Sequence, residues 1–405
     1  MVNLNHDALQ PSSTPPNPLT RRTFLISTAA LSLTGALAGT DSLAIAPPPK
    51  TDSKRILVGS GTPDGILSFA WDAATGTLTP EGIAAKISHS TWIDLSPDRR
   101  FLYVACELDE FEGKPTGAVG SFKNEAGKLT PISLVPAEGK GTCHLNVDRT
   151  GHAVICANYA GGTAASFLST EGKLSEAWHE VYKGHGPVAD RQEMAHAHFV
   201  SFSPDNRFVY INDLGSDKIH IYKLNAATAQ LTPAGAYTAT AGDGPRTLHF
   251  HPTGKVAYCV DELNSTVEVL AWNASDGTLH SIQKVSLLPK GEPQQTASIT
   301  NTACDAVLTH DGRFAYFANR GHDFIMSFHI DPVTGRLTEF TSGLRIPSGG
   351  TTPRNFRLDP TERWMLVANQ SSSNLTVYAR DPKTGILSGD GRNTPAATPM
   401  CIVFV

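Results

Sequence analysis

Short apolar runs separated by tight turns recur along this chain with a period of about fifty residues. At each repeat a turn precedes an aromatic-rich run. The six turns begin at Ser96, Asp148, Ser203, His251, Thr309 and Asp359. In residues 101–105 (Phe-Leu-Tyr-Val-Ala) both faces of the predicted strand are apolar, as expected for a sheet that is covered on both sides. The pattern therefore predicts one β-sheet per repeat, stacked against its neighbours.

The two ends of the chain are complementary. A seventh repeat begins at residues 56–58 but lacks the strand that should precede it, and residues 400–404 supply an apolar strand without a repeat of its own. Pairing them closes a ring and removes exposed sheet edges. We therefore predict an all-β fold, a seven-bladed β-propeller over residues 55–405 closed by the N- and C-terminal strands. A β-sandwich array is the alternative, which the uniform period and the complementary ends disfavour.

The first 46 residues have the pattern of an export leader. Residues 1–20 are polar and Pro-rich, as in a disordered arm. Arg21 and Arg22 then precede an uncharged run, ending at Gly39, that is short for a membrane span. This order resembles a Tat signal. We predict a signal and arm over 1–46, a Pro-rich linker over 47–54, and a mature protein that is periplasmic or secreted, with no membrane anchor. A membrane-anchoring helix or a plain arm on a cytoplasmic protein is the alternative.

Composition excludes several classes of function. The net charge is −5 and no long basic run occurs, so we expect no nucleic-acid partner. The six cysteines are widely spaced without a Cys-x-x-Cys pair, which favours buried thiols over a metal or redox motif. The chain lacks a Gly-x-Ser-x-Gly elbow, a phosphate loop and a Gly-x-Gly-x-x-Gly motif, which argues against a serine hydrolase or a nucleotide enzyme.

The strongest candidate for chemistry is the stretch 244–269. Arg246 precedes one predicted strand and Glu262 follows the next, across the turn at 251–254. In an antiparallel meander these two positions lie at the same end of the sheet. An ion pair that closes a blade is the structural alternative. Further polar residues at the ends of the strands that should line the channel are His144, His196, His198, Arg320 and Arg354. Arginines from three blades at one mouth would be costly without an anion between them.

Two pairs of histidines could in principle bind a metal. His196 and His198, and likewise His249 and His251, lie two residues apart, so each pair could share a strand face. No third ligand occurs at a matching spacing. We therefore predict no metal site and no cofactor.

The motifs at 195–198, 213–218, 244–246 and 258–267 resemble the lactonase family of seven-bladed propellers, which includes propeller-type 6-phosphogluconolactonases and fungal carboxymuconate cyclases. The resemblance extends over 55–405 in repeat layout. It implies a metal-free site of one His, two Arg and one Glu, which by motif are His198, Arg246, Arg320 and Glu262. We expect His144, His196 and Arg354 to contact substrate.

The resemblance implies hydrolysis of a sugar lactone in carbohydrate metabolism. We hypothesise that Glu262 activates water, that Arg246 and Arg320 hold the substrate's anionic group and the oxyanion, and that His198 protonates the leaving alkoxide. A cycloisomerase or lyase acting on muconate-type diacids, or a non-catalytic propeller that binds partners through its rims, are the alternatives. We expect a monomer whose partner is a small lactone. Which lactone, and whether it is phosphorylated, is left open by the sequence.

Overall fold

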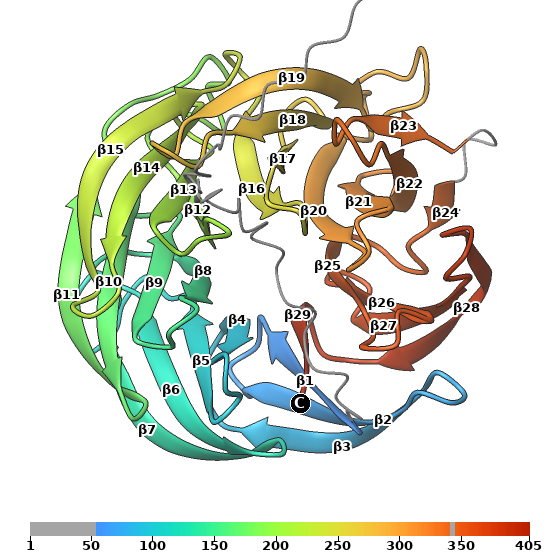
Figure 1. Ribbon diagram of the computed structural model, residues 1–405. Helices are drawn as coiled ribbons and strands as arrows, with labels where there is room; N and C mark the ends of the chain where they lie inside the picture. The colour runs from blue at the N-terminus through green and yellow to red at the C-terminus, as the bar shows by residue number, and fades with distance from the viewer. Residues whose placement is uncertain (1–53, 341–344) are drawn as a thin grey trace, which may run out of the picture. The chain divides into compact units, whose positions relative to one another are not determined.

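Seven antiparallel sheets, arranged as the blades of a propeller, make up the described part of the chain (Figure 1). The structure is a computed structural model that describes residues 54–340 and 345–405. The predicted leader, and the predicted linker up to residue 53, lie outside these residues. The seven sheets confirm the predicted all-β fold, a seven-bladed β-propeller. No helix in the described ranges could serve as a membrane span.

Each blade begins with an inner strand and ends with an outer one. Blade 1 contains β29 (Pro399–Phe404), β1 (Arg55–Ser60), β2 (Ile66–Asp72) and β3 (Thr77–Ala85). Blade 2 contains β4 (Ser90–Leu95), β5 (Phe101–Cys106), β6 (Ala118–Glu125) and β7 (Lys128–Pro136). Blade 3 contains β8 (Thr142–Val147), β9 (Ala153–Asn158), β10 (Thr163–Thr170) and β11 (Lys173–Val181). Blade 4 contains β12 (Ala197–Phe202), β13 (Phe208–Asp213), β14 (Lys218–Asn225) and β15 (Gln230–Thr238).

The remaining blades follow the same order. Blade 5 contains β16 (Pro245–Phe250), β17 (Val256–Asp261), β18 (Thr266–Trp272) and β19 (Leu279–Ser286). Blade 6 contains β20 (Thr302–Leu308), β21 (Phe314–Arg320), β22 (Phe324–Ile330) and two short outer strands, β23 (Leu337–Glu339) and β24 (Arg345–Pro347). Blade 7 contains β25 (Pro353–Leu358), β26 (Trp364–Asn369), β27 (Asn374–Arg380) and β28 (Leu387–Pro395).

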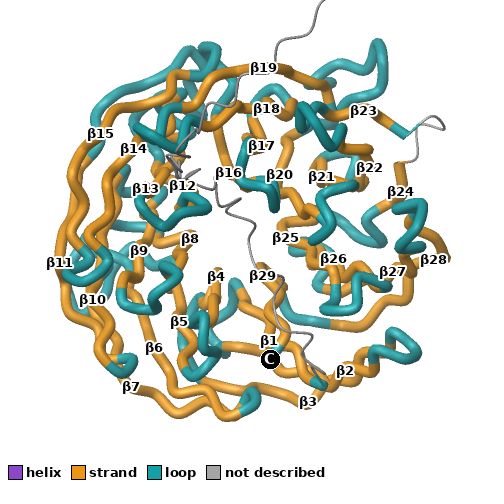
Figure 2. The backbone as a smooth tube through the Cα atoms, in the orientation of Figure 1, coloured by secondary structure: helices purple, strands orange, loops and turns teal. Residues whose placement is uncertain are grey.

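The two ends of the chain close the ring, as predicted. Strand β29 pairs antiparallel with β1, and this pairing places Leu57 opposite Val403 and Val58 opposite Ile402. The first strands of successive blades contact one another around the ring, and β29 contacts β4 (Figures 1 and 2). These inner strands therefore surround a central channel, and each is the inner edge strand of its own sheet.

A repeated hydrogen bond joins neighbouring blades. The second strand of several blades carries a fully buried tyrosine whose hydroxyl donates to a glycine carbonyl in the outer turn of the next blade. The pairs are Tyr210 with Gly277 (2.8 Å), Tyr258 with Gly335 (2.8 Å) and Tyr316 with Gly385 (2.6 Å). Each of these three glycines begins a Gly-x-Leu stretch of the sequence. These stretches mark places where one blade docks on the next, and a side chain at these glycines would separate the blades.

Replacing Gly335 with alanine tests this docking. Gly335 has a φ of +72°, and an added Cβ would lie 2.5 Å from Val256 Cγ2. Gly113 is the matched control, with a φ of +74° and no atom within 4 Å of an added Cβ. We expect Gly113→Ala to cost about 1 kcal/mol of unfolding free energy and Gly335→Ala about 1–3 kcal/mol more, measured by urea denaturation. Equal losses in the two variants would contradict the role in docking.

Candidate active site

The side chains at one mouth of the channel come from bulges on the inner strands. In β12, Ala197 pairs with Asp213 and Phe199 with Asn212, so His198 is an extra, unpaired residue. The same shift leaves Arg246 of β16 and Arg354 of β25 without a partner across the sheet. A bulge redirects the side chain of the extra residue. His198, Arg246 and Arg354 accordingly line one small cavity inside the channel.

Glu262 lies at the centre of this site. It directly follows β17, and its backbone nitrogen donates to Gly244 O at 2.8 Å, which fixes it beside Arg246. Its Oε2 contacts Arg246 Nη1 at 2.5 Å and Arg320 Nη2 at 3.0 Å. Its Oε1 contacts Arg191 Nη2 at 2.5 Å. The structure thus brings the predicted Arg246, Arg320 and Glu262 together, with one further arginine.

The three arginines decide the charge of Glu262. The side chain is only 2% exposed, and burial alone would raise its pKa. The positive charges of Arg320, Arg246 and Arg191 outweigh burial and hold the pKa of Glu262 well below its ordinary value. Glu262 is therefore ionised at neutral pH, and the four side chains together carry a net positive charge.

His198 contacts the same arginine but is neutral. Burial and the charge of Arg246 lower the pKa of His198 well below its ordinary value. Its Nε2 lies 2.6 Å from Arg246 Nη1, and because a guanidinium only donates, Nε2 must accept. The network therefore assigns the hydrogen of the ring to Nδ1, which is buried without a partner among the described residues. His198 thus has one N–H donor that no described residue accepts.

Two of the predicted substrate contacts, His144 and Arg354, line the same cavity as His198 and Arg246. The His144 ring packs at a tilt against both Trp92 and Phe199, with ring centroids at 4.2 and 3.8 Å. Its Nδ1 accepts from the Val200 backbone at 3.2 Å, so His144 is held tightly within the channel. Arg354 is paired with Glu107, at 3.6 Å between Nη2 and Oε2.

The third predicted substrate contact, His196, packs against Tyr159 beside the site. Its Nδ1 lies 2.9 Å from the Tyr159 carbonyl oxygen and its ring stacks on the Tyr159 ring at 4.4 Å. Its Nε2 lies 3.2 Å from Glu193. The Tyr159 ring also meets the His198 ring edge-on, with 5.7 Å between the ring centroids. His196 thus lies against a residue that contacts His198.

Sequence reasoning missed Arg191 and Tyr159. Arg191 lies in the connection 182–196 between β11 and β12, which spans 15 residues (196 − 182 + 1). The connection 287–301 between β19 and β20 is equally long (301 − 287 + 1), and its Asn301 Oδ1 accepts from the His322 backbone at 3.3 Å, two residues beyond Arg320. Two long connections thus flank the cluster. Their length, visible in the repeat spacing, is the signal that could have identified them.

The two histidine pairs that the sequence offered as possible metal ligands contact different partners. His198 faces Arg246, whereas His196 faces Tyr159 and Glu193. His249 contacts Asp305 at 3.0 Å, whereas His251 Nε2 lies 3.0 Å from the Gly312 carbonyl oxygen. Neither pair turns both rings toward a common point.

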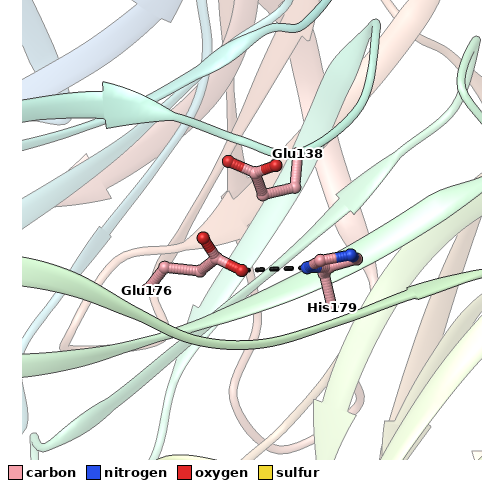
Figure 3. A group of neighbouring side chains, drawn as sticks. All are labelled: Glu138, Glu176 and His179. Atoms are coloured by element: carbon pink, nitrogen blue, oxygen red, sulfur yellow. Dashed lines mark hydrogen bonds and ion pairs between the residues drawn. The ribbon is translucent and has the colours of Figure 1, made fainter.

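Two other groups have the composition of a cation site. Ligand atoms of Glu138, Glu176 and His179 lie within 4.8 Å of one another on the outer side of blade 3, where His179 already hydrogen-bonds Glu176 at 2.9 Å (Figure 3). The carboxylates of Asp243, Asp261 and Glu268 are likewise close and are buried.

The buried group has its own cation. Lys284 Nζ donates to Asp243 and lies 3.8 Å from Asp261. Burial and the neighbouring carboxylate of Asp243 raise the pKa of Asp261 to about 8. Asp261 directly precedes Glu262 in the chain. The backbone carbonyl oxygen of Asp243 accepts a hydrogen bond from the Leu263 nitrogen at 3.0 Å, just after Glu262. This group therefore braces the turn that carries Glu262.

The opposite end of the inner strands opens into a separate cavity of about 540 Å³. Asp94, Ser201, His249 and Arg357 contribute its polar lining. Burial raises the pKa of Asp94 to about 6. This cavity contains none of His198, Arg246, Glu262 and Arg320, so the sequence-predicted catalytic residues belong to the other mouth.

Comparison with known proteins identifies a matching family and several relatives of this chain. The family profile described as "Lactonase, 7-bladed beta-propeller" matches residues 55–404. A 6-phosphogluconolactonase of Bacillus subtilis is 33% identical over 348 residues, covering 85% of this chain and 95% of the relative. A 6-phosphogluconolactonase of Formosa agariphila is 31% identical, covering 80% of this chain and 90% of the relative.

A solved structure agrees with these sequence matches. The periplasmic gluconolactonase of Pseudomonas aeruginosa superposes with a TM-score of 0.79 at 30% identity, covering 87% of this chain and 98% of that one. The family match spans every blade and both strands that close the ring. The chain therefore belongs to the lactonase family of seven-bladed β-propellers.

Proposed function

We propose that this protein hydrolyses a sugar lactone at the mouth of the channel that holds Glu262. The observation that carries the proposal is the arrangement of one ionised carboxylate, three guanidinium groups and a neutral imidazole with a free N–H donor, in a member of the lactonase family. Lactone hydrolysis needs a base for water, donors for an oxyanion and a proton for the leaving oxygen. The site offers a group for each.

In the proposed reaction Glu262 takes a proton from water as the water oxygen bonds to the lactone carbonyl carbon. The negative charge that develops on the carbonyl oxygen is stabilised by the guanidiniums of Arg246 and Arg320. The bond between the carbonyl carbon and the ring oxygen then breaks. The proton held by Glu262 passes to the departing alkoxide, which leaves a hydroxy acid and restores the carboxylate.

His198 has a different part from the one expected from the sequence. A residue that protonates the leaving alkoxide as an imidazolium must be charged, whereas burial and Arg246 lower the pKa of His198 and keep the ring neutral. A neutral imidazole can still donate a hydrogen bond. We propose that Nδ1–H of His198 donates a hydrogen bond to the oxyanion, beside the arginines. Glu262 alone then carries out both proton transfers of the reaction.

The excess of positive charge favours a lactone that carries an anionic group. A guanidinium binds phosphate or carboxylate with two parallel hydrogen bonds. The named relatives include both 6-phosphogluconolactonases and a gluconolactonase. For this chain, Arg354 and the three arginines around Glu262 are the groups that would bind such an anion.

We also propose that the protein is exported. The twin arginines at 21–22 and the short apolar run after them support this, and the structural relative from Pseudomonas aeruginosa is described as periplasmic. Its site would then meet lactones outside the cytoplasm.

The function is tested with a panel of substrates. We expect the protein without its leader to hydrolyse glucono-1,5-lactone or its 6-phosphate, and Glu262→Gln to lower kcat by about 10²–10⁴-fold because the base is lost. Glu81→Gln, an exposed glutamate of β3 that pairs with Arg55, is the control and should retain activity. Circular dichroism checks that both variants fold. Turnover of a muconate diacid alone would favour the cycloisomerase alternative, and no turnover of any substrate a binding protein.

The pH dependence of stability tests the charge of Glu262. Because its pKa is lowered on folding, its ion pairs contribute fully above the unfolded pKa of about 4.3, and their contribution is lost as pH falls through the lower folded value. We expect Glu262→Gln to lower the unfolding free energy by about 3 kcal/mol at neutral pH. Urea denaturation should show this difference constant from about pH 8 to 5 and shrinking below about pH 4. A difference that varies between pH 5 and 8 would contradict an ionised Glu262.

Export is tested by changing the twin arginines. In a bacterium with twin-arginine export, we expect the full chain in the periplasmic fraction with its leader removed. The double variant Arg21→Lys, Arg22→Lys should remain unprocessed in the cytoplasm, whereas the control Lys50→Arg should be exported normally. Immunoblots of the two fractions measure the result, and equal export of both variants would exclude this route.

A further inference from the structure

Both carboxylate oxygens of Glu262 are bound by arginines in this structure, whereas a general base needs an oxygen that is free to reach water. Its Oε2 is shared by Arg246 and Arg320, and its Oε1 is bound by Arg191 at 2.5 Å. A base needs an oxygen within hydrogen-bond reach of the water that it deprotonates. In addition, a carboxylate held by three guanidiniums is a weak base, because its pKa lies well below the range in which proton transfer is efficient. One of these contacts must be released for catalysis.

Arg191 is the arginine best placed to leave. Its side chain is 36% exposed, whereas those of Arg246 and Arg320 are 6% and 14% exposed. Arg246 is further fixed because its Nε donates to the Cys304 carbonyl at 2.8 Å. Arg191 is also the only one of the three that lies outside a strand, in the long connection before β12. Its removal would free Oε1 and leave the contacts to Oε2 in place.

The backbone under Arg191 is nevertheless firmly held. The neighbouring Gln192 is fully buried, and its Nε2 donates to Leu214 O and Asp217 Oδ1, both at 2.8 Å. Asp217 in turn accepts from the backbone nitrogen of Gly244 at 2.8 Å, two residues before Arg246. The guanidinium of Arg191 can therefore change partner without a rearrangement of the loop that carries it.

We propose that Arg191 is an anion-sensing residue: a phosphate or carboxylate group on the substrate draws its guanidinium away from Glu262 and so frees Oε1 to activate water. This inference rests on the proposed lactonase function and deepens it. An anion competes well for a guanidinium because both of its oxygens can accept at once.

In this proposal, binding of the substrate's anionic group at Arg191 also changes the reactivity of Glu262. Arg191 is one of the three charges that lower the pKa of Glu262, so its departure makes Glu262 a stronger base as well as a more accessible one. A neutral lactone leaves Arg191 on Glu262 and reacts slowly. The charge of the substrate thus selects for turnover and not only for binding.

The test compares glucono-1,5-lactone with its 6-phosphate. In wild type we expect a preference for the phosphate ester, expressed as the ratio of kcat/KM values. In Arg191→Ala this ratio should fall by about 10–100-fold, the range of one hydrogen-bonded charge contact, with kcat on the neutral lactone equal to or above that of wild type. Arg191→Lys, which keeps the charge but not the two parallel donors, should give an intermediate ratio.

Inorganic phosphate provides a second measurement. Added to wild type, it should raise the rate on the neutral lactone, because it occupies Arg191 while the sugar ring lies beside Glu262. It should have no such effect on Arg191→Ala. Arg149→Ala removes one positive charge at the opposite cavity and should change neither the ratio nor the activation.

The outcomes separate this inference from the proposed function. If Arg191→Ala loses activity equally on both lactones, Arg191 only positions Glu262 and the inference is wrong. If phosphate inhibits wild type on the neutral lactone, the anion does not free Glu262 and the inference is also wrong. If wild type hydrolyses neither lactone, the proposed function itself fails, and the inference falls with it.

Discussion

A single extra residue near the start of the inner strands is the constraint on which the site depends. In a regular antiparallel pair each residue faces a partner, and side chains alternate between the two faces. The bulge leaves residues such as His198, Arg246 and Arg354 unpaired, each at the same level of its own blade. The ring closed by β1 and β29 then brings these equivalent positions around one channel. The bulges thus supply His198, Arg246 and Arg354, while Glu262, Arg320 and Arg191 come from the ends of second strands and from a connection.

The second requirement is that buried charges compensate one another. Arg246 is nearly inaccessible to water and is held by Glu262, His198 and the Cys304 carbonyl. The desolvation of such a group is repaid only by close partners. Burial together with this positive charge lowers the pKa of His198, and Arg320, Arg246 and Arg191 together lower the pKa of Glu262. Charge state, hydrogen-bond direction and position are therefore determined together, and a change in one side chain alters the others.

This dependence explains what the sequence could and could not predict. The fold followed from the period of about fifty residues and the complementary ends, and Arg246 with Glu262 followed from the geometry of two antiparallel strands. The role of His198 could not be derived, because its protonation depends on an arginine from another blade. Arg191 was missed because residues 182–196 follow no strand or helix period, and its contact with Glu262 joins residues 71 positions apart. Long-range contacts made by irregular segments have no local signature.

The two ends of the channel differ in how their charges are balanced, and this difference argues for where the substrate binds. His249 and Arg357, which line the opposite cavity, are both paired with the Asp305 carboxylate, at 3.0 Å and 3.2 Å, so these groups have a partner within the fold. At the Glu262 mouth three guanidiniums share one carboxylate, and the least buried of them, Arg191, reaches solvent. A folded chain has no reason to gather like charges unless an anion joins them. The imbalance therefore supports the proposal that an anionic ligand binds at this mouth rather than at the larger cavity.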